Sequence, residues 1–121
     1  NNLKKFNLLE RVENNKQIIL APPLGYLEFQ NLVKNSLFCL TDSGGIQEET
    51  TYLRVPCITL RPNTERPSTT TIGTNTLLNL EVNAVLEVIN SIFDKSYKSG
   101  KIPPLWDGKA SWRIAETIRK L

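Results

Sequence analysis

Short apolar segments alternate with amphipathic helical patterns along this chain, and that alternation constrains its fold more than any other feature. The apolar segments typical of strands are Lys16–Ala21, Leu37–Thr41, Pro56–Leu60 and Asn75–Leu78. The helical patterns cover the first dozen residues, Tyr26–Asn35, Ile46–Leu53, Val82–Phe93 and the chain from Ala110 to its end. Strands that are apolar on both faces and alternate with helices predict a doubly wound, parallel α/β sheet of the Rossmann-like type.

The remaining patterns refine these expectations. Leu27, Leu32 and Val33 are the residues of the second helix expected to face inward. Asp107 is expected to cap the start of the final helix, and Pro22 and Gly25 to form a turn.

Size and charge exclude several classes of protein. The chain has 121 residues, which fits one domain, and its net charge of +3 is scattered rather than clustered, so no nucleic-acid partner is predicted. No apolar run approaches the roughly 20 residues that cross a bilayer, and no signal-peptide core is evident, so we expect a cytoplasmic protein without membrane contact. The chain does not begin with Met, which suggests a piece of something longer.

The absence of histidine removes further chemistry. Without His, these residues cannot form a Ser-His-Asp or Cys-His catalytic group or a His-based metal site. Cys39 and Cys57 lie inside apolar runs and are expected to be buried strand thiols rather than ligands or nucleophiles. We predict neither a metal nor a cofactor.

Two irregular loops follow strands and are the first site candidates. In a parallel α/β sheet, ligands bind outside the carboxyl ends of the strands, where Asp42–Gly45 and Arg61–Gly73 are expected. Ser43, Gly44 and Gly45 precede a predicted helix, whose unpaired N–H groups and positive dipole end suit a diphosphate. Glu49 lies one turn deeper, where its carboxylate could accept hydrogen bonds from ribose hydroxyls. The alternative is that Ser43 only caps the helix and the glycines form a turn.

The second loop and an earlier turn add further candidates. Arg66 could offer its guanidinium to phosphate oxygens, with Pro62 and Pro67 stiffening the loop; the alternative is an ordinary exposed turn with a Glu65–Arg66 pair. Backbone groups near Leu24 could pair with a base edge, and Phe29 could face the base ring, although core packing of Phe29 is an equal alternative.

Several segments resemble one family in the same order along the chain. They are Leu40–Glu49 (LTDSGGIQEE), Val55-Pro56, Asn63–Pro67 (NTERP), Gly73–Asn75 and Trp106–Ala110. This set is similar to the non-hydrolysing UDP-N-acetylglucosamine 2-epimerases from about residue 20 onward. The resemblance implies that the chain is the UDP-holding C-terminal half of a glycosyltransferase-B-type two-domain enzyme, residues 1–121 forming that half.

The resemblance also implies roles for individual residues. Ser43, Gly44 and Gly45 match the diphosphate-binding segment, Glu49 the ribose-binding glutamate and Arg66 a substrate-contacting arginine, while Leu24 and Phe29 occupy uracil-contacting positions. The implied reaction interconverts UDP-GlcNAc and UDP-ManNAc by eliminating UDP and adding it back. The family's acid/base carboxylates lie in the absent N-terminal domain, so this fragment should contain no catalytic residue, bind UDP weakly and turn over nothing.

Other functions and partners stay open from the sequence. The same residues fit the donor-binding domain of a glycosyltransferase with this architecture, or a non-catalytic sugar-nucleotide sensor. The expected partners are a UDP-sugar and the missing N-terminal domain, and a homodimer is left open.

Overall fold

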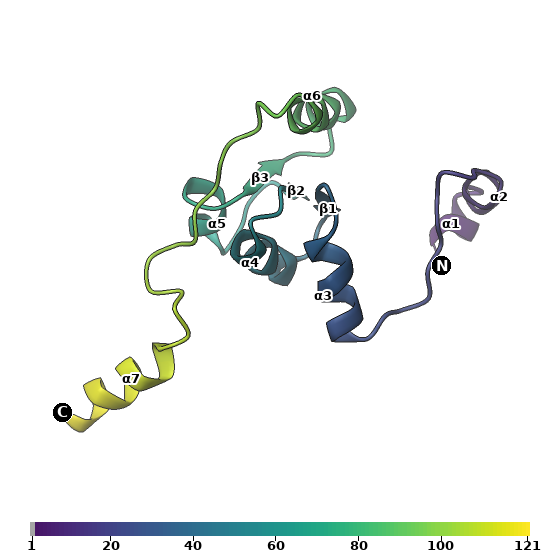
Figure 1. Cartoon of the computed structure of the whole chain (residues 1–121). Helices are drawn as coiled ribbons and strands as arrows, with labels where there is room; N and C mark the ends of the chain where they lie inside the picture. Colours follow the sequence, from purple (N-terminus) through teal and green to yellow (C-terminus); the bar gives the residue numbers. More distant parts are fainter. Residues whose placement is uncertain (1) are drawn as a thin grey trace.

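Three parallel strands form the centre of the computed structural model, which describes residues 2–121 (Figure 1). The strands are β1 (Cys39–Thr41), β2 (Cys57–Leu60) and β3 (Asn75–Leu78), in the order β1-β2-β3. The first residues of the three strands lie opposite one another, Cys39 beside Cys57 and Cys57 beside Asn75. The predicted parallel α/β class and three of the four predicted strands are therefore confirmed.

Helices precede, connect and follow the three strands, and they lie on both sides of the sheet. They are α3 (Tyr26–Lys34), α4 (Gly44–Leu53), α5 (Pro67–Thr71) and α6 (Val82–Phe93), followed by α7 (Ala110–Arg119). In Figure 1, α4 and α5 lie on one side of the sheet and α6 on the other. All but α5 match helices predicted from the sequence. Among residues 2–121, no helix has the length and apolar character needed to cross a membrane.

The buried residues are unusually polar. The apolar ones are Val33, Val55, Cys57, Ile58 and Ile92, whereas the polar ones are Gln47, Thr50, Thr51, Thr59, Thr69, Thr74 and Asn75. Most of the polar set lies between α4, α5 and the adjoining strands. Hydrogen bonds link Gln47, Thr59, Thr69 and Asn75 to one another, so this side of the sheet is organised by a polar network as well as by apolar packing.

The two thiols differ in burial. Cys57 is fully buried, as predicted, and burial is the main cause that raises the pKa of its thiol. Cys39 on β1 is only half-buried, because no further strand covers its side of the sheet among residues 2–121, although partial burial still raises its pKa.

The strand predicted over Lys16–Ala21 is wrong. The segment contains no strand, and the Ile19 side chain is 89% exposed. The Ile18 N–H instead closes a turn on the Asn15 carbonyl at 3.0 Å. A strand persists only where a neighbour accepts and donates its backbone hydrogen bonds, and no described strand lies on the outer side of β1.

The N-terminal helix is also not as predicted. Instead of one amphipathic helix, α1 (Asn2–Lys5) and α2 (Leu9–Glu13) are separated at Asn7, whose φ of 55° is left-handed. Of the three α3 residues expected to face inward, Val33 is buried, whereas the side chains of Leu27 and Leu32 are 80% and 56% exposed.

The segment after α6 crosses the beginning of β3. The Tyr97 hydroxyl donates to the Thr74 carbonyl at 2.7 Å, and Lys98 Nζ donates to the carbonyls of Thr70 and Asn75. Further on, a Cβ at Gly100 would overlap the backbone of Gly73. These contacts hold the segment closely against the sheet.

Asp107 does not cap α7 as predicted. The helix begins after Lys109, and Asp107 instead binds Arg113, with its carboxylate oxygens 2.8 and 3.0 Å from the guanidinium nitrogens. The Lys109 N–H also donates to this carboxylate, at 3.0 Å. The hydrogen bonds from Arg113, followed by the one from Lys109, lower the pKa of Asp107 from 3.8 to about 2.

Candidate functional site

The loops that follow β1 and β2 leave the sheet at the same edge, because the two strands are parallel neighbours. The first leads into α4 and the second into α5, and the two helices contact each other. The prediction that Asp42–Gly45 and Arg61–Gly73 share this edge is confirmed. The details differ, since α4 already begins at Gly44, and α5 lies inside the segment expected to be a loop.

Ser43 precedes the first turn of α4 in an extended conformation. Its hydroxyl makes no capping hydrogen bond, so the interpretation of Ser43 as a simple helix cap is wrong. Its backbone N–H donates to the Thr41 hydroxyl at 3.0 Å, which fixes the approach to the helix. Ser43 is exposed. The start of α4 therefore presents an unused hydroxyl beside N–H groups that have no partner within the helix.

The two glycines at this helix start have different surroundings. A Cβ at Gly45 would meet nothing within 4 Å, so the space outside this residue is open. A Cβ at Gly44 would lie 2.9 Å from Glu65 Oε1, so the Glu65 side chain of the second loop packs close to this residue. Gly44 thus lies beside the second loop, while Gly45 leaves the backbone accessible to an anion.

Glu49 faces a pocket rather than the protein interior. It is half-buried and lines a cavity of 320 Å³ with Tyr26, Tyr52 and Trp106; the remaining lining residues are Gln30, Glu48 and Leu53. Aromatic walls with carboxylates at one side suit a ligand that has a flat apolar part and hydroxyl groups.

Arg66 is held by α4. Its Nε lies 3.1 Å from Glu48 Oε2, and the two side chains are 44% and 42% exposed. The alternative Glu65–Arg66 pair considered from the sequence is therefore wrong, because Glu65 pairs with Arg61, at 3.4 Å. A hydrogen bond from its own N–H and the charge of Arg61 hold the pKa of Glu65 below its ordinary value. Since the Glu48 pair uses Nε, the two Nη groups of Arg66 can serve another acceptor.

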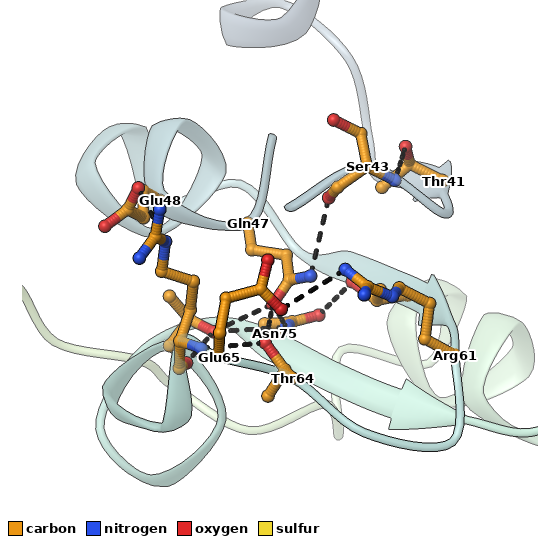
Figure 2. A network of polar contacts seen from close by, with 11 residues as sticks. Thr41, Ser43, Gln47, Glu48, Arg61, Thr64, Glu65 and Asn75 are labelled. Atoms are coloured by element: carbon orange, nitrogen blue, oxygen red, sulfur yellow. Dashed lines mark hydrogen bonds and ion pairs between the residues drawn. The ribbon is translucent and has the colours of Figure 1, made fainter. Parts of the chain in front are cut away.

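A buried amide lies behind both loops, as Figure 2 shows. Gln47 Oε1 accepts a hydrogen bond from the Thr64 hydroxyl at 2.7 Å, and its Nε2 donates to the Ser43 carbonyl at 3.4 Å. Asn75 at the start of β3 also donates to Gln47 Oε1, at 3.1 Å. One side chain therefore links the loop after β1, the loop after β2 and the sheet.

Comparison with known proteins identifies the family. The model of the UDP-N-acetylglucosamine 2-epimerase family matches residues 1–119. This chain belongs to that family. The suspected resemblance is thereby confirmed over nearly the whole chain.

Epimerase relatives show how much of a complete protein the chain represents. It is 43% identical over 116 residues to the UDP-N-acetylglucosamine 2-epimerase of Methanocaldococcus jannaschii, covering 96% of this chain and 31% of that protein. For the epimerase of Methanococcus maripaludis the identity is 44% over 118 residues, with the same coverage. The chain spans about a third of the length of these relatives.

Solved epimerase structures share the fold. The M. jannaschii enzyme in complex with UDP-GlcNAc and UDP superimposes with a TM-score of 0.81 at 41% identity, covering 98% of this chain and 32% of that one. The Neisseria meningitidis enzyme bound to UDP-GlcNAc gives a TM-score of 0.74 at 30% identity, covering 100% of this chain and 34% of that one.

The structure of this epimerase-family chain separates the two residues predicted to contact a base from Glu49. Phe29 is half-buried and lines a second, mostly apolar pocket of 260 Å³, whose walls include Thr41 and Ile46 on either side of the Ser43–Gly45 segment. Leu24 is exposed and lies immediately before Gly25, the N-cap residue of α3. Phe29 therefore adjoins the diphosphate candidate rather than the Glu49 pocket.

Sequence reasoning missed three residues that shape this site. The sequence pattern does not mark Gln47, Glu48 or Arg61 as individual site residues. Their positions inside the family motif were visible, but only the folded structure shows Glu48 beside Arg66 and Gln47 behind both loops. No group of three or more Cys, Asp or Glu side chains within residues 2–121 is arranged to hold a metal ion.

Proposed function

We propose that this chain is the nucleotide-holding domain of a UDP-N-acetylglucosamine 2-epimerase. In this proposal Ser43, Gly44 and Gly45 bind the diphosphate, and Glu49 binds the ribose hydroxyls. Arg66 contacts the substrate near the diphosphate. Leu24 and Phe29 contact the uracil from the turn before α3 and from α3 itself.

One observation carries the proposal: the start of α4 is open and unused. The Ser43 hydroxyl makes no capping bond, and the space outside Gly45 is empty. Glu49, one turn further along the helix, faces a pocket. Unpaired N–H groups and a free hydroxyl favour an anion at this point, and family membership supports a UDP diphosphate as that anion.

The proposed reaction inverts C2 of the sugar by eliminating UDP and adding it back. As the bond between the sugar and UDP breaks, negative charge develops on the diphosphate. Three kinds of donor would stabilise that charge: the N–H groups at the start of α4, the Ser43 hydroxyl and the Arg66 guanidinium. They are already positioned before the reaction begins. This chain thus holds and stabilises the leaving group, while the proton transfer at C2 belongs to the rest of the enzyme.

The complete protein is proposed to have two domains of the glycosyltransferase-B type. The N-terminal domain would contribute the acid/base carboxylates and close the cleft over the substrate. We expect a cytoplasmic enzyme acting on a UDP-sugar and leave a homodimer open. Family membership favours this function over a glycosyltransferase donor domain.

Replacing Glu49 tests the site. In the complete enzyme, Glu49→Ala should weaken UDP binding by about 1–3 kcal/mol, the range for charge-assisted hydrogen bonds, as measured by calorimetry. Glu87→Ala, an exposed change on α6 across the sheet, is the matched control and should leave the affinity unchanged. Equal UDP affinities in the two variants would count against the assignment.

Isotope exchange separates an epimerase from a sugar-nucleotide sensor. Elimination and re-addition require the proton at C2 to leave and return, so UDP-GlcNAc incubated with the complete enzyme in D₂O should acquire deuterium at C2. A sensor would bind the same nucleotide and leave C2 unlabelled, which would refute the enzymatic part of the proposal.

A further inference from the structure

Gln47 is completely buried, although glutamine is mostly a surface residue. Its carbonyl oxygen faces two donors, Thr64 and Asn75, and its amide nitrogen faces the Ser43 carbonyl. Turning the amide over would set oxygen against oxygen at Ser43 and donor against donor at Asn75. The surroundings therefore fix one orientation of this side chain.

The backbone of Arg66 is held on both sides by hydroxyl groups that meet at Gln47. The Arg66 N–H donates to the Thr64 hydroxyl at 3.0 Å, and the Thr69 hydroxyl donates to the Arg66 carbonyl at 2.7 Å. The two hydroxyl oxygens lie 2.7 and 3.5 Å from Gln47 Oε1. Because the Thr64 hydroxyl donates its proton to Gln47, a displacement of Gln47 would move this support of Arg66.

The sheet anchors this arrangement. Asn75, fully buried at the start of β3, donates to Gln47 and accepts a hydrogen bond from the Thr59 hydroxyl of β2 at 2.7 Å. Because Asn75 and Thr59 belong to neighbouring strands, Gln47 is tied to the central strands of the sheet.

We propose that Gln47 is a positioning residue that sets where Arg66 lies relative to the Ser43–Gly45 segment. The inference rests on the proposed function, because the relative position matters if both groups bind one nucleotide diphosphate. Binding groups on two separate loops act together only when a common support holds them within a fraction of an ångström of the productive geometry. Gln47 is that support, since it bonds to the Ser43 carbonyl and to the hydroxyl beneath Arg66.

Thr64→Val in the complete enzyme tests the link without removing the buried amide itself. The change keeps the shape of the half-buried side chain but removes the hydroxyl between Gln47 and Arg66. We expect UDP to bind roughly fivefold to tenfold more weakly, the loss of about one hydrogen bond, with Thr64→Ser restoring the affinity to within about twofold. Thr71→Val is the matched control, because its hydroxyl bonds only to the Pro67 carbonyl within α5.

A double-mutant cycle separates positioning from a general effect on the fold. If Thr64 acts through Arg66, Thr64→Val should cost less than about twofold in UDP affinity when Arg66 is already alanine. Equal losses in both backgrounds, or a Thr64→Val variant that binds UDP like Thr71→Val, would overturn this inference alone. A wild-type enzyme that binds no UDP would overturn the proposed function itself.

Discussion

Arg66 Nε lies 3.1 Å from Glu48 Oε2, so a residue of α4 holds the arginine that immediately precedes α5. The exposed pair joins the second candidate loop to α4, while Gln47 joins the two candidate loops on the buried side. Both members are nearly half exposed, so the pair contributes little to folding, about 0–1 kcal/mol. Its effect should therefore be seen in ligand binding more than in stability.

Removing the charge of Glu48 should loosen Arg66. We expect Glu48→Gln to weaken UDP binding by about 1 kcal/mol or less and to leave the unfolding temperature nearly unchanged, because an exposed pair adds little stability. Calorimetry at low and high salt would measure the loss. Glu116→Gln breaks a comparable exposed pair with Arg119 on α7 and is the control. The prediction is refuted if both variants bind UDP alike.

Gly45→Ala should separate stability from binding. The added methyl group meets nothing within 4 Å, so the free energy of unfolding should stay constant or rise by up to about 1 kcal/mol through helix propensity. The same methyl group would occupy the space proposed for the diphosphate, so UDP affinity should fall. Gly73→Ala provides the contrast, because its Cβ would lie 2.5 Å from Thr51 and should lower stability by about 1–3 kcal/mol. Denaturant unfolding and UDP titration of the same samples would decide.

Phe29→Ala should affect only ligands that carry a base. Contact between an aromatic ring and a base contributes about 1–3 kcal/mol, so UDP should bind more weakly while inorganic pyrophosphate binds as before. Tyr26→Ala, on the same helix but in the Glu49 pocket, is the comparison. If Tyr26→Ala and not Phe29→Ala shows the base-dependent loss, the uracil lies in the Glu49 pocket and the assignment of Phe29 is wrong.

The Asp107–Arg113 pair should make stability depend on acid pH. The pKa of Asp107 falls from 3.8 to about 2 in the folded chain, so the ionised form is favoured by folding. The stabilisation is present above about pH 4 and is lost as the pH falls through about 2. Asp107→Asn should lower the thermal midpoint above this window and match wild type below it. A difference that stays constant across the window would contradict the assignment.

Local patterns predicted most of the fold because they act within single elements. The helices α3, α4, α6 and α7 follow the spacing of their apolar residues, and β3 begins and ends where its apolar segment does. Such patterns do not reveal which other helix or strand packs against an element or forms hydrogen bonds with it. Lys16–Ala21 has the composition of a strand, but it lacks a hydrogen-bonded neighbour and stays irregular.

The short helix α5 was missed for a related reason. Serine and threonine are weak helix formers, so the sequence of Pro67–Thr71 predicts part of a loop. In the structure, Pro67 occupies the first turn, where its missing N–H costs nothing, and the Thr69 hydroxyl bonds to the Arg66 carbonyl. Tertiary contacts therefore decide this helix.

The position of the candidate site at one edge of the sheet was predictable, but the side-chain pairings within it were not. The motif around Ser43 and Glu49 indicated an anion and its sugar, and both residues lie at the expected sheet edge. The sequence does not show which residue pairs with Arg66. Glu65 is its neighbour in the chain, whereas Glu48 comes near it only in the folded structure. Only the fold shows that Glu65 turns to Arg61.

The segment after α6 also decides in which direction the sheet can be enlarged. Lys98 takes the Asn75 carbonyl, which would otherwise begin a new ladder of hydrogen bonds along the outer margin of β3. Among residues 2–121, the outer edge of β1 has no neighbouring strand and no comparable side-chain hydrogen bond. Any additional strand contributed by a longer polypeptide would therefore have to join next to Cys39–Thr41, so growth of this sheet is one-sided.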